Sequence, residues 1–337
     1  MNALVNYGQL SRSVNAKSMS NQVLGQRDIA AVSVPIRRKS IWNEMRRKAP
    51  LYLFLVPTVL FLLVFMYYPA FTALRLSLYQ WDGFSPPRWV GLDNFQRLFT
   101  DSVMRASIGN MLILTLARIA IVLTTPLLAA ELVFSLKNQR WQYWYRVIFV
   151  VPLVVPEVVT YLIWKFIFNP AVGLANVMLG NVGLAMLTNE WLGSHQTVLL
   201  SLALVGFPWI AGINFLIYLA GLQNIPREIL DATAVDGATG LRRFRLIDLP
   251  LIMGQIKLLL ILSVIFTLQH FVLVLIMTNG GPGYASMVPG LLMYEAAFQD
   301  GRFGYACAIG TALFVVIFIL TYINMRYIRA ETEHAPE

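Results

Sequence analysis

Residues 305–325 read YACAIGTALFVVIFILTYINM, an apolar run without any Asp, Glu, Lys or Arg. An α-helix rises about 1.5 Å per residue, so about 20 apolar residues are enough to cross the ~30 Å hydrocarbon core of a bilayer. This run therefore predicts a transmembrane helix. The composition of the whole chain agrees, because 58% of its 337 residues are apolar and only 13% are charged. Such a composition argues against a soluble enzyme.

Five further apolar segments precede this run. They lie near 51–74, 107–134, 146–168, 197–222 and 257–278. Each has the length that a spanning helix needs, or comes close to it. The chain is therefore predicted to be an all-α integral membrane protein with six transmembrane helices.

The Lys and Arg residues of the connecting segments are distributed unequally between the two sides. With a cytoplasmic N-terminus, nineteen of them lie inside and five lie outside. Because Lys and Arg in short connections set the orientation of membrane proteins, both termini are predicted to be cytoplasmic. The net charge of +9 then reflects membrane orientation, and nucleic acid is not an expected partner.

Three regions follow from this topology: a basic cytoplasmic tail over 1–50, a six-span domain over 51–328, and a short cytoplasmic tail over 329–337. The first tail has no apolar core after its early positive charges, so it does not resemble a cleaved signal. Two RRK clusters, at 37–39 and 46–48, precede the first span. They either stop translocation or bind a membrane lipid or a partner.

The connection between the fourth and fifth segments carries the strongest local signals. Its residues 222–250 read LQNIPREILDATAVDGATGLRRFRLIDLP. Pro226 suits the first position of a helix, and Asp236-Gly237 predicts a turn because glycine adopts positive φ at little cost. A second helix is predicted over about 239–248, before the final proline of the stretch. These signals leave two interpretations, a protruding helix-turn-helix or an amphipathic connector that rests on lipid headgroups.

The order of residues in this connection resembles the coupling loop of permease subunits in binding-protein-dependent ABC importers. That pattern runs Glu-Ala-Ala, two residues, Asp-Gly-Ala and, further on, a proline. It is matched here by Asp231, Ala232, Thr233, Asp236, Gly237, Ala238, Phe244 and Pro250. The spacing is intact, and the departures are Asp231 for Glu and Thr233 for Ala. The resemblance implies that this cytoplasmic coupling loop docks on an ATPase subunit, packing its apolar face while its arginines meet acidic residues of the partner.

The resemblance covers about 51–328. The motifs WVGLDNF at 89–95, LAGL at 219–222 and TNGGPG at 278–283 resemble the sugar-permease branch, in particular the first of two unlike permeases in maltose-type and glycerol-phosphate-type importers. It implies a multi-pass protein of a bacterial inner membrane that pairs with a second permease subunit. Two ATPase subunits and an extracytoplasmic solute-binding protein are implied as further partners, with a sugar, an oligosaccharide or a polyol phosphate as solute.

The chain is not expected to be an enzyme or to bind a cofactor. It has no Gly-x-x-x-x-Gly-Lys-Ser/Thr motif to hold nucleotide phosphates, so ATP and Mg are expected on the ATPase subunits. Its three histidines, at 195, 270 and 334, belong to no cluster with metal-ligand or triad spacing, and no metal site is expected. The alternative function is a secondary transporter or channel driven by an ion gradient. That class favours paired broken helices in corresponding halves, and no such repeat is visible.

Two charged residues lie deep in the predicted spans, Arg118 in the second and Glu157 in the third. Their similar depth allows a structural ion pair, or Arg118 faces the translocation path and meets an acidic group of the solute, such as a uronate. Lys165 is interpreted as snorkelling towards the interface. The other substrate-path candidates are Tyr161, Trp209, Asn214, Gln269 and His270. Their side chains can stack on sugar rings or bond to hydroxyls, but the same residue types also serve in ordinary helix packing.

Overall fold

The computed structural model describes residues 53–210 and 212–327. The predicted tails over 1–50 and 329–337 lie outside these residues. Over the described part the chain is mostly helical and includes one short two-stranded sheet. The all-α prediction is therefore confirmed apart from this small hairpin.

The chain divides into two compact units, residues 1–62 and residues 63–337. Within its described part, the first unit holds the helix α3 (Val56–Leu62). The second unit holds, in chain order, η1 (Leu63–Tyr67), α4 (Tyr68–Leu76), β1 (Tyr79–Gln80), β2 (Arg88–Trp89), α5 (Asp93–Thr100), α6 (Ser102–Phe134), α7 (Gln139–Val150), η2 (Val151–Val154), α8 (Glu157–Ile167), α9 (Leu174–Asn181), η3 (Ala185–Leu187), α10 (Val198–Leu204), α11 (Gly212–Gln223), α12 (Arg227–Val235), α13 (Gly240–Arg243), η4 (Phe244–Asp248), α14 (Leu249–Leu251), α15 (Met253–Gln269), α16 (Val272–Met277), α17 (Pro289–Phe298) and α18 (Phe303–Tyr327). The strands β1 and β2 pair antiparallel, with Tyr79 opposite Trp89.

Three stretches of helix are long and apolar enough to cross a membrane without a sharp break. They are Val56–Leu76, Ser102–Phe134 and Phe303–Arg326. Two further pairs of helices pass the same test together but are bent, by 91° between η2 and α8 and by 70° between α14 and α15. Within the described residues the chain thus has three such helices, or up to five if each bent pair is one span.

The count of six transmembrane helices is not confirmed, because the third, fourth and fifth predicted segments each contain helix but are interrupted. In the third, Pro152 and Pro156 lie on either side of the turn between α7 and α8, where neither ring nitrogen can donate a helical hydrogen bond. In the fourth, α10 ends at Leu204, and Gly206 and Trp209 both have positive φ before α11 begins. In the fifth, α15 ends before His270, whose backbone is extended.

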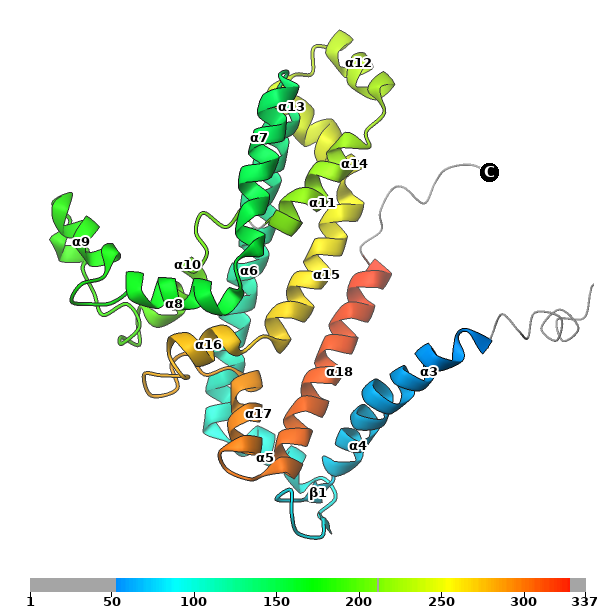
Figure 1. Ribbon diagram of the computed structural model, residues 1–337, viewed down its shortest axis with the longest axis vertical. Helices are drawn as coiled ribbons and strands as arrows, with labels where there is room; N and C mark the ends of the chain where they lie inside the picture. Colours follow the sequence, from blue (N-terminus) through cyan, green and yellow to red (C-terminus); the bar gives the residue numbers. More distant parts are fainter. Residues whose placement is uncertain (1–52, 211, 328–337) are drawn as a thin grey trace, which may run out of the picture. The chain divides into compact units, whose positions relative to one another are not determined.

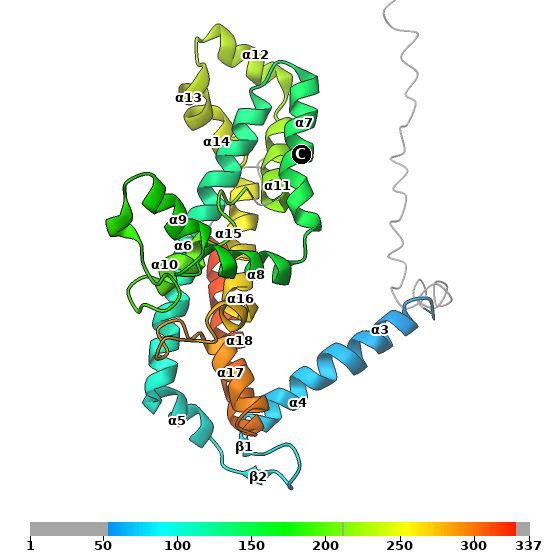
Figure 2. The ribbon, with the colours of Figure 1, turned by 60° about the vertical axis from the view of Figure 1, so that its left-hand side comes forward.

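The second unit is built around α6. Figures 1 and 2 show α11 and α15 packed along the C-terminal part of α6. Near the N-terminal end of α6, α17 and α18 pack together. The loop with α12 and α13 lies at one end of these helices, and α5 and β1 lie at the opposite end. In Figure 1, α8 runs across the direction of α7, as the 91° bend requires.

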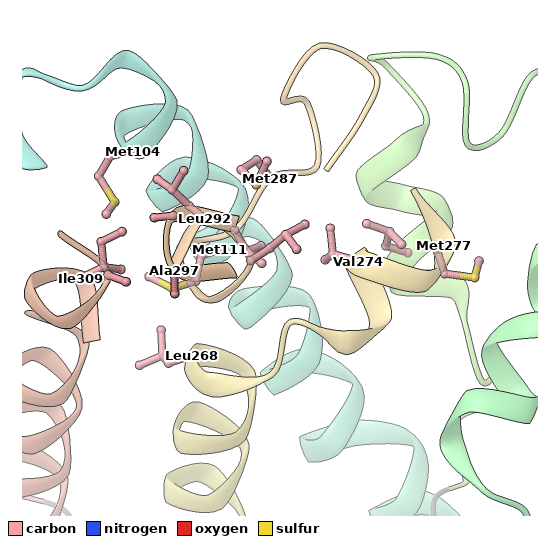
Figure 3. Packing of buried hydrophobic residues seen from close by; sticks show 14 of the residues in the cluster. Met104, Met111, Leu268, Val274, Met277, Met287, Leu292, Ala297 and Ile309 are labelled. Carbon is pink, nitrogen blue, oxygen red and sulfur yellow. The ribbon is translucent and has the colours of Figure 1, made fainter. Parts of the chain in front are cut away.

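Two hydrophobic clusters hold α6 in place. The first joins the beginning of α6 to α17 and α18, and Figure 3 shows Met104, Met111, Leu292, Ala297 and Ile309 within it. The second joins the end of α6 to α11 and α15, through side chains that include Val122, Ala130, Phe215, Tyr218 and Leu259. The α6 residues between the two clusters border the candidate site.

Candidate functional site

A cavity of about 120 Å³ lies beside Arg118, between the two parts of α6 that the clusters hold. Its walls come from α6, α8, α10, α15 and α16 and from the segment after α10. The walls are mainly apolar. The polar and aromatic side chains that line it are Arg118, Tyr161, Trp209, Phe266, Thr267 and His270. The cavity thus brings together four of the seven predicted substrate-path residues, Arg118, Tyr161, Trp209 and His270. They come from the second, third, fourth and fifth predicted spans.

The carboxylate of Glu157 belongs to the same group of side chains through two hydrogen bonds. Its Oε2 accepts from the Tyr161 hydroxyl at 3.2 Å and lies 3.1 Å from Nε2 of His270. Glu157 is the first residue of α8, and Tyr161 follows one helical turn later. His270 lies at the break between α15 and α16, so the bent helices bring these three side chains into contact.

Of the two alternatives for Arg118, the direct pair with Glu157 has no ion pair to support it in the described part of the chain. The similar depth of Arg118 and Glu157 was inferred from one straight helix over 146–168. The chain instead bends by 91° before α8, and Glu157 lies at the start of a new helix. Its carboxylate is bound to His270 and Tyr161 instead.

The guanidinium of Arg118 packs on an aromatic ring. Its Cζ lies 5.5 Å from the ring centroid of Phe266, a separation at which a cation and the face of an aromatic ring attract. Phe266 in turn stacks on His270, with ring centroids 4.5 Å apart and planes 18° apart. The buried Nε of Arg118 has no hydrogen-bond partner among the described residues. The cavity is therefore lined by a cation with unused hydrogen-bonding capacity and no directly bonded carboxylate.

Three other candidates have different surroundings. Trp209 lines the cavity, but its indole Nε1 donates to the carbonyl oxygen of Ala203 at 3.0 Å. Asn214 is buried in α11, and Gln269 is exposed at the end of α15; neither lines the cavity. Lys165, interpreted as snorkelling, donates from Nζ to the carbonyl oxygen of Ile276 at 2.8 Å. This bond ties the end of α8 to the end of α16.

Phe266 and Thr267 were missed in the sequence. Both line the cavity, and Phe266 lies one helical turn before His270. Helical spacing of four residues from a polar candidate is a signal that would have identified Phe266. Thr267 has no comparable signal, because threonine is common in the interiors of membrane helices.

The coupling loop has the predicted helix, turn and helix. α12 is followed by Gly237, whose φ is +68°. The amide of Gly237 donates to the carbonyl oxygen of Ala234 at 3.2 Å, and the amide of Ala238 donates to that of Thr233 at 2.9 Å. These two bonds form the Schellman arrangement that ends a helix at a left-handed residue. The turn therefore depends on the conformation that glycine provides.

The remaining residues of the coupling loop divide between its surface and its interior. Asp231, Ala232 and Asp236 are exposed. Phe244 is half-buried and packs against the second cluster. The helical stretch does not stop at the predicted end near 248, because α14 follows η4 directly and ends at Leu251. Pro250 is accommodated there because it lies in the first turn of α14, where no amide donor is needed.

Arg243, one of the arginines that the resemblance assigns to the partner's acidic residues, binds carboxylates of this chain. Its guanidinium forms ion pairs within the chain, with Glu131 of α6 and Asp248 of η4. Neither carboxylate was among the sequence candidates. Glu131 is 112 residues away along the chain, so no local pattern could have identified it.

Several long apolar helices, of which three are long enough to cross a membrane, are typical of an integral membrane protein. The family model described as "Binding-protein-dependent transport system inner membrane component" matches residues 122–333, and the chain belongs to this family. It is thus a multi-pass inner membrane protein of the ABC permease class, which confirms the resemblance found in the sequence.

Three relatives are named as permeases of such systems. The probable ABC transporter permease protein YurN of Bacillus subtilis is 34% identical, over 84% of this chain and 97% of its own length. The multiple sugar-binding transport system permease protein MsmF of Streptococcus mutans is 32% identical, over 81% and 93%. The sn-glycerol-3-phosphate transport system permease protein UgpA of Escherichia coli O157:H7 is 30% identical, over 84% and 95%.

A solved structure has the same fold. It is a chain of a bacterial ABC transporter involved in the import of the acidic polysaccharide alginate, and it superposes with a TM-score of 0.74 at 23% sequence identity. The match covers 86% of this chain and 100% of the other. At this identity the comparison establishes the fold alone.

Proposed function

We propose that this chain is one permease half of an ATP-driven importer for a sugar or oligosaccharide that carries a carboxylate or phosphate. Family membership supports the importer, and the names of the sugar-binding and glycerol-phosphate relatives support the solute class. The acidic group rests on one observation, the guanidinium of Arg118 in the cavity wall without a directly bonded carboxylate. In a site of low polarity such a cation gains most from an anionic ligand.

The remaining subunits follow from the family. A second permease would complete the translocation path, two ATPase subunits would hold ATP and Mg, and an extracytoplasmic binding protein would deliver the solute. The relative solved in complex with an alginate pentasaccharide-bound periplasmic protein supports that last partner. We propose six spans within 51–328, with both termini in the cytoplasm.

The coupling loop is proposed to lie on the cytoplasmic side and to dock on an ATPase subunit. It lies at the end of the helices opposite α5 and β1 (Figures 1 and 2). In a membrane that these helices cross, the loop and the α5–β1 region would therefore lie on opposite sides. The excess of Lys and Arg favours the cytoplasm for that end. Its exposed apolar side chains, Val235 at 88%, Leu241 at 63% and Leu246 at 60% exposure, are typical of a surface that a partner covers.

The test of solute recognition compares Arg118→Met, Glu157→Gln and the double variant. Each is expected to assemble, because methionine fills a similar space and glutamine keeps an oxygen for Tyr161 and His270. Uptake of an acidic saccharide should fall in both variants that lack Arg118, while uptake of a neutral analogue should change less. Full acidic uptake by the double variant would show that Arg118 serves only to balance Glu157.

The ion-gradient alternative keeps one supporting observation. Broken helices beside a cavity also occur in secondary transporters, and three of the predicted spans are broken here. ATP dependence of uptake separates the two functions.

A further inference from the structure

The side chain of Arg243 joins the coupling loop to α6. Its Nε donates to Oδ2 of Asp248 at 2.8 Å, and its Nη2 donates to Oε1 of Glu131 at 3.0 Å. Nη2 also lies 3.3 Å from Oγ of Ser135, which itself donates to Oε1 of Glu131 at 3.1 Å. The guanidinium lies over the ring of Phe134, 5.5 Å from its centroid. One cation thus holds two carboxylates from separate elements.

The two carboxylates are withdrawn from solvent. The side chain of Asp248 is 0% exposed and that of Glu131 is 13% exposed, while that of Arg243 is 23% exposed. Within the described residues, Oδ1 of Asp248 and Oε2 of Glu131 are buried without hydrogen-bond partners. Each carboxylate therefore depends on Arg243 for its neutralisation, and without the guanidinium the two negative charges would repel each other.

The local backbone is shaped to make this contact. Residues five apart lie about 140° apart around an α-helix, so Arg243 and Asp248 would face different directions. The intervening residues form the π-helix η4, whose wider turn brings positions five apart onto one side. Extra-wide turns of this kind are often found at functional sites.

The contact leads directly towards the cavity. Glu131 and Arg118 lie on the same continuous helix α6, thirteen residues or about 20 Å apart along its axis. Pro126 lies between them and removes one helical hydrogen bond, but α6 continues across it as one helix. Movement of the loop at Arg243 can therefore be passed along α6 to the cavity wall.

We propose that Arg243 is a positioning residue for transport: its bridge to Glu131 and Asp248 passes movement of the coupling loop to α6 and to the cavity. This inference rests on the proposed function of the chain as an ATP-driven permease. Loss of the bridge is expected to leave the importer assembled and hydrolysing ATP while less solute moves per ATP.

The experiment uses the complete importer in vesicles, with its ATPase subunits, second permease and binding protein. Arg243→Gln, Arg243→Lys and Glu131→Gln are compared with Arg140→Gln, a matched control because Arg140 of α7 is an exposed arginine outside the coupling loop without an ion pair in the described structure. The measured quantity is solute transported per ATP hydrolysed. Assembly is measured in the same vesicles, so that a fall caused by loss of complex is distinguished from a fall in coupling.

Solute per ATP should fall about tenfold in Arg243→Gln, within the usual range of coupling between distant sites. Arg243→Lys and Glu131→Gln should fall in the same direction, because lysine cannot span both carboxylates and the neutral amide loses the charge on α6. The Arg243→Gln/Glu131→Gln double variant should be no worse than Arg243→Gln, since both changes break one link. Arg140→Gln should match the unmodified protein.

An unchanged ratio in Arg243→Lys and Glu131→Gln would overturn the inference, as would an equal fall in Arg140→Gln. If Arg243→Gln does not assemble, the conservative variants Arg243→Lys and Glu131→Gln test the inference. Failure of the unmodified importer to transport with ATP would instead contradict the proposed function, so the two failures are distinguishable.

Discussion

Replacing Gly237 by valine should uncouple the loop from transport while the protein remains in the membrane. Gly237 has φ +68°, and a Cβ built there meets no atom within 4 Å. Steric overlap therefore contributes little, and the penalty comes from backbone conformation. A side chain in the left-handed region costs about 1–2 kcal/mol, and a β-branched residue lies at the upper end or beyond. A penalty of about 2 kcal/mol changes the population of the native turn roughly 30-fold.

The assay measures ATP-driven uptake and complex assembly in the same vesicles. Gly237→Val is expected to assemble and to lose most of its uptake, because α12 and α13 can no longer hold their relative orientation. Gly237→Asn is the matched variant, since asparagine tolerates left-handed φ and should keep most of the uptake. Gly301→Val places the same strain, at φ +64° with no atom within 4 Å, in the connection before α18 and should spare coupling. Near-normal uptake by Gly237→Val would refute the role of this turn.

Two further predictions concern orientation and packing. In a Cys307→Ala background, a cysteine at Ser85, which is exposed beside β1, should react with an impermeant reagent from outside, and one at Thr239 only from the cytoplasm; labelling of Thr239 from outside would contradict the topology. Gly304→Ala should lower the midpoint of thermal unfolding by several degrees, since its Cβ would overlap the carbonyl oxygen of Tyr79. Gly109→Ala, in α6 with open space around its Cβ, should leave the midpoint unchanged or raise it slightly, and equal midpoints for both variants would contradict this packing.

Features encoded in local sequence were predicted well. The apolar segments follow from hydropathy, and the turn at Gly237 follows from the preference of glycine for positive φ. Arg118, Tyr161, Trp209 and His270 were selected because polar and aromatic groups in spans are uncommon, and the cavity brings these four together.

The breaks in the helices and the ion pairs were not predicted. Hydropathy averages over a window, so an apolar stretch with Pro152 and Pro156 in it has the same average as a straight helix. The error carried over to Glu157, whose depth was inferred from a helix that bends. The contact between Arg243 and Glu131 depends on tertiary packing across 112 residues, which no periodicity encodes.

The central claim is that ATP hydrolysis on partner subunits drives the solute through this permease. The most direct measurement is uptake of an acidic saccharide into vesicles that contain the complete importer, with the binding protein outside and ionophores present to remove all ion gradients. Uptake is expected to require ATP on the side of the coupling loop, to stop when the ATPase subunits are left out, and to continue with the ionophores. Uptake that persists without ATP or the ATPase subunits, and that the ionophores abolish, would contradict the account and establish a gradient-driven transporter.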